Sequence, residues 1–186
     1  MEIILIRHGR PDVNINQKIY ATQLKLFVDK YNKKGISFNS FPPKKLKESI
    51  HSIILSSDLK RSVDSVKALQ LSDKVLIDSD SLFREAGIPF ANWKGVRLKA
   101  KTWFVIFRIL WCFGYSNGCE SKYESTLRAK RGAKKLIEYS NQHKSVTLMG
   151  HGIMNKLLSN ELKSLGWREK NRWGFSYWGV RVLQKD

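Results

Sequence analysis

Short apolar runs recur along this chain, and stretches with helical spacing lie between them. Residues 3–6, 52–55, 75–77 and 146–149 are each three or four residues long and mostly apolar. Runs of that length and composition are typical of strands buried on both faces, as in a parallel sheet. A last stretch, residues 176–183, predicts one more strand, which we expect at an edge of the sheet.

Four segments between these runs place apolar residues three and four positions apart, the spacing of a helix with one buried face. We expect helices over residues 15–31, 59–69, 121–142 and 153–165. Strands that alternate with helices predict an α/β protein with a three-layer α/β/α architecture and a mostly parallel central sheet. No repeat or linker interrupts the pattern, so we expect a single domain over residues 1–186.

Residues 93–118 depart from this pattern. Arg97, Lys99 and Lys101 precede a run of aromatic and aliphatic residues at positions 103–113. The run is too short to span a bilayer, which takes about 20 apolar residues. Two interpretations stay open. The segment is either a buried helix or lid packed over an active site, or a helix in a membrane interface, with its aromatic face in lipid and its basic neighbours on anionic head groups.

The charge balance of the chain is strongly basic. Its 186 residues include 34 Lys and Arg against 16 Asp and Glu, a net charge of +18. Such an excess favours anionic partners: phosphate esters, nucleic acid or an anionic membrane surface. A lysine-coated surface without any such partner explains the same excess equally well. No DNA- or RNA-binding motif is visible, so we do not expect a nucleic-acid partner.

The cysteines and the first residues bear on location. Cys112 and Cys119 form no metal-binding or redox motif, and reduced thiols in a cytosolic protein explain them most simply. Glu2 follows Met1 and the apolar run after it is only four residues long, which does not suit a signal peptide. We therefore expect a cytoplasmic protein, with a peripheral position at the inner face of the membrane as the alternative.

The residues that follow the predicted strands carry the chemistry. Arg7 and His8 follow the first strand, and Arg61 lies in the first turn of the helix after the second. His151 follows the fourth strand. Ligands of open α/β sheets bind outside the carboxyl ends of the strands, which share one edge. We therefore expect two histidines and two arginines around one crevice, as a phosphate site with a nucleophile and a partner.

An ordered set of short motifs resembles the histidine phosphatase superfamily, in the branch that includes the cofactor-dependent phosphoglycerate mutases. The motifs are, in order, Arg7-His8-Gly9, Ser56-Ser57 with Arg61, Leu82 with Glu85 and Pro89, and Gly150-His151-Gly152. They extend over nearly the whole chain. The fold of that family is the one expected from the strand and helix pattern.

The resemblance implies a role for each residue of the crevice. His8 would be the nucleophile that forms a phosphohistidine. Arg7 and Arg61 would clamp the phosphoryl oxygens, and His151 would complete the phosphate pocket. The physical chemistry supports this division, because a histidine nucleophile must be neutral and two nearby guanidinium groups lower its pKa. Arginines also supply the charge stabilisation that phosphoryl transfer needs.

The resemblance extends to two further residues and then weakens. Glu85 matches the family's proton donor to the leaving oxygen, and we expect it to be catalytic. Asn14, six residues after His8, stands where the family often has a phosphate-contacting Asn. However, Arg10-Pro11 replaces the usual Glu-Thr or Glu-Ser, and residues 87–95 keep only the outline of a Gly-x-Trp-Glu-Gly-like segment. The substrate preference therefore stays open.

From these residues we expect a metal-independent phosphatase without a cofactor that hydrolyses a phosphate monoester, either a phosphorylated small molecule or a phosphoprotein. A phosphoglycerate mutase-like phosphoryl transferase is the alternative enzyme, although the chain lacks the long insertions that cover a mutase site. The alternative outside enzymes is a protein of this fold that binds polyanions or an anionic membrane. The role of residues 93–118 and the oligomeric state do not follow from the sequence.

Overall fold

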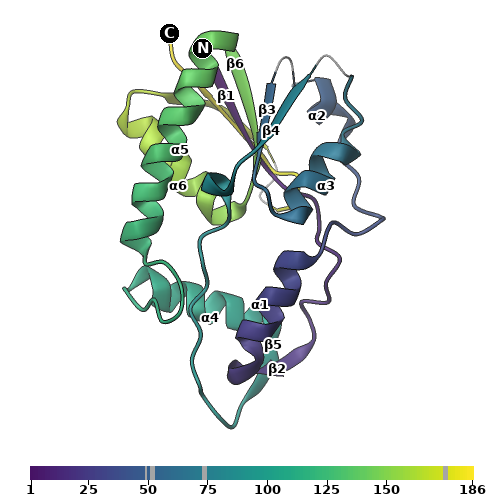
Figure 1. The fold of residues 1–186 in the computed structure, drawn as a ribbon, viewed down its shortest axis with the longest axis vertical. Coiled ribbons are helices and arrows are strands. Elements are labelled where there is room, and N and C mark those ends of the chain that lie inside the picture. Colours follow the sequence, from purple (N-terminus) through teal and green to yellow (C-terminus); the bar gives the residue numbers. More distant parts are fainter. Residues whose placement is uncertain (49, 51–52, 73–74, 174–175) are drawn as a thin grey trace.

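A six-stranded sheet forms the centre of the molecule in the part of the chain that the structure describes (Figure 1). The structure is a computed structural model and describes residues 1–48, 50, 53–72, 75–173 and 176–186. The strand order is β4-β3-β6-β1-β8-β7, in which the first four strands are mutually parallel and the last two pairings are antiparallel. The strands are β1 (Glu2–Arg7), β3 (Ile53–Ser56), β4 (Leu76–Ser79), β6 (Ser145–Gly150), β7 (Arg168–Trp173) and β8 (Val180–Gln184).

Alternate residues of β1 face opposite sides of the sheet, and each side has its own apolar core. Ile3 and Leu5 pack with α5 and α6, whereas Ile4 and Ile6 pack with α2 and α3. Figure 1 shows these two pairs of helices on opposite faces of the sheet. The helices are α2 (Lys44–Glu48), α3 (Lys60–Ala68), α5 (Lys122–His143) and α6 (Gly152–Ser164). Helices on both faces of a mostly parallel sheet confirm the predicted α/β/α architecture.

The predicted helices on the sheet are correct to within one residue at each end. Helices α3, α5 and α6 occupy the segments predicted over residues 59–69, 121–142 and 153–165. Helix α5 begins with a capping box, in which the Ser121 hydroxyl accepts from the Glu124 N–H and the Glu124 carboxylate accepts from the Ser121 N–H. This local signal explains why its start was predictable from sequence.

Strand boundaries were less predictable. The strand predicted over residues 52–55 covers Ile53–Ser56, and Ser52 lies outside the described residues. The strand predicted over residues 75–77 covers Leu76–Ser79. Because polar residues close both strands, a search for apolar runs stops too early.

The position predicted for the C-terminal strand was wrong. Strand β8 lies between β1 and β7, and the edge strand on that side of the sheet is β7, which was not predicted. The sequence of β7 is REKNRW, which contains no apolar run. A polar strand of this kind suits an exposed edge, but it is invisible to an analysis based on apolar patterns.

A second, smaller part of the chain lies beyond the carboxyl ends of the parallel strands (Figure 1). We call this part the cap. It consists of β2 (Lys18–Tyr20), a 3₁₀ turn (Ala21–Gln23), α1 (Leu24–Lys33), β5 (Arg97–Lys99) and α4 (Ala100–Cys112). Strands β2 and β5 pair antiparallel, and buried residues of α1 and α4 form an apolar cluster separate from the two cores of the sheet. The cap therefore has a core of its own.

The helix predicted over residues 15–31 was wrong in its first half. The helix α1 begins only at Leu24, after β2 and the 3₁₀ turn. Ile19 is buried in the cap cluster, and its carbonyl accepts a hydrogen bond from Trp103 Nε1 at 2.9 Å. Pairing with β5 and this contact hold the segment extended, so long-range contacts decide its conformation rather than the local apolar spacing.

Helix α4 resolves how the aromatic run at residues 103–113 is placed. Trp103, Phe107 and Trp111 face the protein interior and are at most 4% exposed. The Trp111 Nε1 also donates to the Glu120 carbonyl at 2.8 Å. These three aromatic side chains therefore pack inside the protein. Within the described ranges, no helix combines the length and the apolarity that crossing a membrane requires.

The orientation of α4 leads to a testable prediction about the free energy of unfolding. The Phe107 side chain is 0% exposed, whereas Phe113 at the end of the same helix is 87% exposed. Because a buried aromatic ring loses both its transfer free energy and its packing, Phe107→Ala should lower the free energy of unfolding by about 3–5 kcal/mol. The matched control Phe113→Ala should change it by less than about 0.5 kcal/mol. Urea unfolding measures both, and equal losses would contradict the orientation of α4.

Candidate active site

His8 and His151 meet because β1 and β6 pair in parallel with Arg7 opposite Gly150. The next residue of each strand is a histidine, and the two ring centroids lie 5.0 Å apart. The backbone N–H of His8 donates to the Gly150 carbonyl at 3.0 Å, which continues the ladder by one step. Both histidines are buried. The register of the sheet therefore brings together two residues that are 143 positions apart in sequence.

The hydrogen-bond partners of His8 determine its tautomer. Its Nδ1 lies 2.7 Å from the Gly9 carbonyl oxygen, which can only accept, so Nδ1 carries the proton. The Nε–H of Arg61 can only donate, and it points at His8 Nε2 at 3.2 Å. His8 Nε2 therefore holds a lone pair. This neutral form is the one that a histidine nucleophile needs.

The surroundings of the two histidines keep them neutral. Burial, together with the positive charges of Arg61 and Arg7, lowers the pKa of His8 from 6.5 to about 3, against the opposing effect of the hydrogen bond to Gly9. Burial also lowers the pKa of His151 well below its usual value, and the charge of Arg61 acts in the same direction. Desolvation disfavours the charged form of a histidine, and a nearby cation adds to that effect.

Arg61 is held on two sides. From the cap, Asn32 accepts a hydrogen bond from Arg61 Nη1 at 3.1 Å, and the Tyr31 ring lies under the guanidinium with its centroid 4.7 Å from Cζ. From α3, the Ser65 hydroxyl donates to the Arg61 carbonyl at 2.6 Å and accepts from the Gly9 N–H at 2.9 Å. The cap and the loop after β1 therefore position Arg61 together.

Arg7 and His151 each have a buried nitrogen without a hydrogen-bond partner among the described residues: Arg7 Nε and His151 Nδ1. The Arg7 guanidinium lies over the Tyr177 ring, 4.7 Å from its centroid. His151 Nε2 lies 3.2 Å from the Ser62 hydroxyl. Buried polar groups almost always have partners, and an oxyanion bound between these side chains would satisfy the Arg7 donor.

Glu85 lies at the N-terminus of α6, the helix whose N-cap residue is His151. Its carboxylate accepts from the Ile153 N–H at 3.2 Å and from the Met154 N–H at 2.9 Å. It also accepts from the Ala86 N–H at 3.0 Å. A carboxylate is stabilised at this positive end of a helix, where backbone N–H groups have no partner within the helix. The start of α6 therefore places Glu85 at the same site as the histidines.

Arg7, His8, Arg61 and Glu85 line one cavity of about 450 Å³. Its other walls come from α1, α4 and residues 84–88. His151 is completely buried beside His8 and does not line this cavity. A volume of this size is ordinary for a small-molecule site. Within the described residues, no group of three or more His, Cys, Asp or Glu could hold a metal ion.

The structure does not bring Asn14 to this cavity. Asn14 is exposed, and its Oδ1 accepts a hydrogen bond from the Asn16 N–H at 3.0 Å. It lines a separate surface hollow together with Arg10 and Tyr177. Asn14 was predicted because it lies six residues after His8, where the family often has an Asn. After the end of β1 the chain turns toward β2, and this turn takes the Asn14 side chain away from the cavity.

Four residues that contact the crevice were not predicted: Tyr31, Asn32, Ser62 and Tyr177. Helical spacing predicts Tyr31 only as a core residue, because an apolar pattern does not distinguish packing from contact with a cation. Ser62 follows Arg61 directly, so the position of Arg61 in the first turn of the helix after a strand was a signal that could have identified it. No comparable signal marks Asn32 or Tyr177.

Comparisons with known proteins identify the family and the fold of this chain. Residues 3–186 match the family described as the histidine phosphatase superfamily (branch 1). No curated protein sequence matches the chain. Solved structures do match the chain, and at the sequence identities found they show that its fold is the same as theirs.

Three of these solved structures show how far the likeness extends. A protein from an open reading frame of Mycobacterium tuberculosis is 12% identical, with a TM-score of 0.63 over 100% of this chain and 91% of that one. YhfR of Bacillus stearothermophilus is 16% identical, with a TM-score of 0.62 over 100% and 91%. A mycobacterial glucosyl-3-phosphoglycerate phosphatase is 20% identical, with a TM-score of 0.62 over 87% and 79%.

The neutral state of His8 predicts a pH dependence of stability. Because its pKa falls from 6.5 to about 3 on folding, the stabilisation is fully present above pH 6.5 and is lost as the pH falls toward 3. Between pH 7 and pH 4 this one group accounts for a loss of roughly 3 kcal/mol. The variant His8→Asn, whose amide can still donate to Gly9, should lose that much less over the same interval.

Urea unfolding at pH 7 and pH 4 measures both losses. Comparing the pH dependence rather than the absolute stability removes any constant effect of the substitution on packing. Equal losses in the two proteins would show that His8 is not kept neutral by its surroundings.

Proposed function

Because this chain belongs to the histidine phosphatase superfamily, we propose that it is a phosphatase that hydrolyses a phosphate monoester through a phosphohistidine at His8. The observation that carries the proposal is the state of His8, whose Nε2 lone pair lies against Arg61 in a cavity that Arg7 also lines. A nucleophile with cations beside it is what phosphoryl transfer requires, because the protein's main contribution is to position groups and stabilise charge.

Substrate binding must first free the nucleophile. The Nε–H of Arg61 donates to the lone pair of His8 Nε2 at 3.2 Å. A phosphoryl oxygen that enters the cavity offers this N–H a stronger, charge-assisted hydrogen bond. Transfer of the donor from His8 to the phosphate releases the lone pair and directs it at phosphorus. Asn32 and Tyr31 hold the rest of the guanidinium in place during this exchange.

The reaction then takes two phosphoryl transfers. In the first, the lone pair of His8 Nε2 forms a bond to phosphorus, and the bond from phosphorus to the alcohol oxygen breaks with its electron pair on that oxygen. Glu85, in its protonated carboxylic acid form, gives its proton to that alcohol oxygen and becomes the carboxylate. In the second, a water oxygen attacks phosphorus, the N–P bond breaks and its electron pair returns to Nε2. Glu85 takes the proton from the water.

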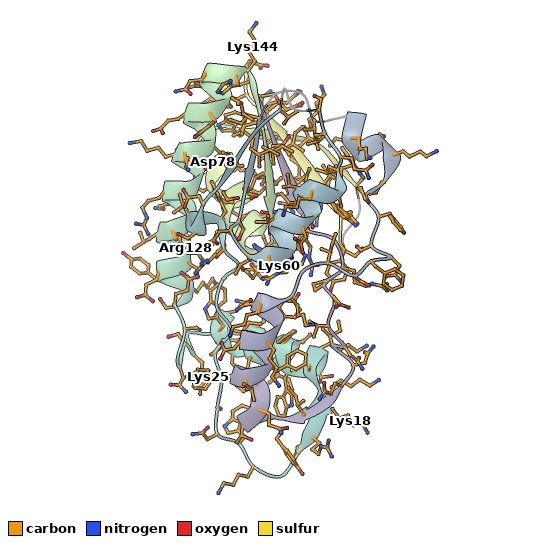
Figure 2. All side chains as sticks on the ribbon, turned by 45° about the vertical axis from the view of Figure 1, so that its right-hand side comes forward. Lys18, Lys25, Lys60, Asp78, Arg128 and Lys144 are labelled. Carbon is orange, nitrogen blue, oxygen red and sulfur yellow. The ribbon has the colours of Figure 1, made fainter. Side chains whose placement is uncertain are left out.

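Binding of a polyanion or of an anionic membrane is the alternative drawn from the net charge. The lysines labelled in Figure 2 are spread along the molecule, with Lys144 at the far end of the sheet, Lys60 near the middle and Lys18 and Lys25 on the cap. The cavity, in contrast, gathers arginines and a neutral histidine at one place, and so we favour the enzyme.

The first prediction concerns the nucleophile. The variant His8→Asn should lose at least about 10³-fold in kcat toward para-nitrophenyl phosphate, because no other side chain of the cavity can replace an activated nucleophile. The assay contains EDTA, since the proposed mechanism uses no metal ion. Labelling the wild-type protein with a ³²P substrate should trap an acid-labile, base-stable phosphoenzyme. Full activity of His8→Asn would refute the mechanism.

The second prediction concerns Glu85. A proton donor matters for an alkoxide that leaves poorly and hardly matters for para-nitrophenolate, which leaves unprotonated. The variant Glu85→Gln should therefore lower kcat/KM by about 10²-fold for an alkyl phosphate and by less than about fivefold for para-nitrophenyl phosphate. kcat/KM is the appropriate constant because it reports the first transfer. Equal losses for the two esters would show that Glu85 acts only as the carboxylate that caps α6.

A further inference from the structure

The cavity of the candidate active site has two chemically different parts. Arg7, His8 and Arg61 come from the sheet edge and form a cationic end. The wall contributed by the cap is largely apolar: Val28 of α1 and Phe104 and Val105 of α4 line the cavity. The polar side chains that the cap adds, Asn32 and Arg108, are hydrogen-bonded to groups of the protein. A phosphoryl group suits the first part, and the second part must therefore contact the alcohol portion of the ester.

The charges of the lining residues leave two cations for the substrate. Four arginines line the cavity, and Glu85 is its single carboxylate among the described residues. Arg84 is paired outside the cavity, because its Nε and Nη2 donate to the two Asp58 carboxylate oxygens at 2.7 and 2.6 Å. Arg108 is half-buried, and the Trp111 ring and two backbone carbonyls hold its guanidinium. Arg7 and Arg61 remain.

Arg108 is also committed to the protein backbone. Its Nη1 donates to the Gly87 carbonyl at 3.0 Å, and its Nη2 donates to the Ala86 carbonyl at 2.8 Å. Its guanidinium stacks on the Trp111 ring, 4.6 Å from the centroid. These contacts fix the segment that carries Glu85. The side chain therefore holds the wall of the cavity, and both of its terminal nitrogens already have a backbone acceptor there.

The two remaining cations balance one phosphoryl dianion. Resting on the proposed phosphatase activity, we infer that the substrate is a monoester with a single phosphoryl group on an uncharged, apolar or aromatic alcohol. A carboxylate or a second phosphate on the alcohol would lie against the apolar wall without a partner, and burying an unpaired charge is strongly unfavourable. Aromatic and aliphatic side chains, in contrast, favour an apolar alcohol by removing its surface from water.

The same argument separates hydrolysis from the mutase reaction. Moving a phosphoryl group between two positions of one molecule through the phosphoenzyme passes through a doubly phosphorylated species in the same cavity. That species carries twice the charge that Arg7 and Arg61 balance. The composition of the cavity therefore favours water as the acceptor in the second transfer.

The test compares two aryl esters of nearly equal size and leaving group: 4-ethylphenyl phosphate, which has an uncharged alcohol, and 4-(carboxymethyl)phenyl phosphate, which carries one more negative charge. For the wild-type protein we expect kcat/KM to be at least on the order of tenfold higher for the uncharged ester. Equal values, or a preference for the carboxylate, would overturn this inference while leaving the proposed phosphatase activity in place. Hydrolysis of neither ester would instead overturn the proposed function.

A positive charge placed in the wall should weaken the preference for the uncharged ester. Val105 lines the cavity and is 59% exposed, so a lysine fits there without disturbing a core. The variant Val105→Lys should raise the ratio of kcat/KM for the carboxylated ester over the uncharged ester by about fivefold or more, because the lysine supplies the missing partner.

Ile109→Lys is the matched control. Ile109 lies one turn further along the same helix, is 53% exposed and does not line the cavity. It adds the same charge to the molecule, so its ratio should equal that of the wild type. An equal rise in both variants would show that the net charge of the surface sets the preference, and no change in Val105→Lys would show that the α4 wall does not contact the alcohol. Either result would overturn the inference.

Discussion

The parallel register between β1 and β6 is the constraint on which the candidate site depends. With Arg7 opposite Gly150, each strand ends at a histidine, and the two rings must lie side by side. A shift of one residue in this register would turn every side chain of β1 to the opposite face and would exchange the two cores of the sheet. Four consecutive β1 residues are buried, two on each face of the sheet. Their packing fixes the register, and the register places the two histidines side by side.

The candidate site also depends on the burial of cations beside neutral histidines, and this burial lowers the stability of the folded protein. Arg61 is only 2% exposed, and burial lowers its pKa. In the described part of the chain it makes no salt bridge, and its partners are an amide oxygen, an aromatic ring and the His8 lone pair. Such weak partners leave a buried charge poorly compensated. An oxyanion bound in the cavity compensates it, so the same feature that costs stability favours phosphate binding.

The parts of the site that sequence could predict are those that strand ends determine. Arg7, His8 and His151 follow apolar runs directly, and Arg61 lies one turn into a helix, so the topology of a parallel sheet brings them to one edge. Asn14 was assigned by its distance from His8 in sequence, and the structure places it elsewhere because distance along a loop does not fix a direction. The polar edge strand β7 and the three-residue strand β2 leave no apolar pattern to detect.

The cap contacts both the wall of the cavity and Arg61, one of the two arginines of the proposed phosphate clamp. The ring of Phe104, in the cavity wall, packs edge-on against Tyr31 with centroids 5.8 Å apart, and Tyr31 lies under Arg61. Phe104 also packs against Phe27 in the core of the cap. A substitution at Phe104 must therefore disturb the core, the wall and the position of Arg61 together. Val105, which is largely exposed and lines the same cavity, has no such dependence. Substrate preference can thus change at the rim of the cavity while the clamp keeps its geometry.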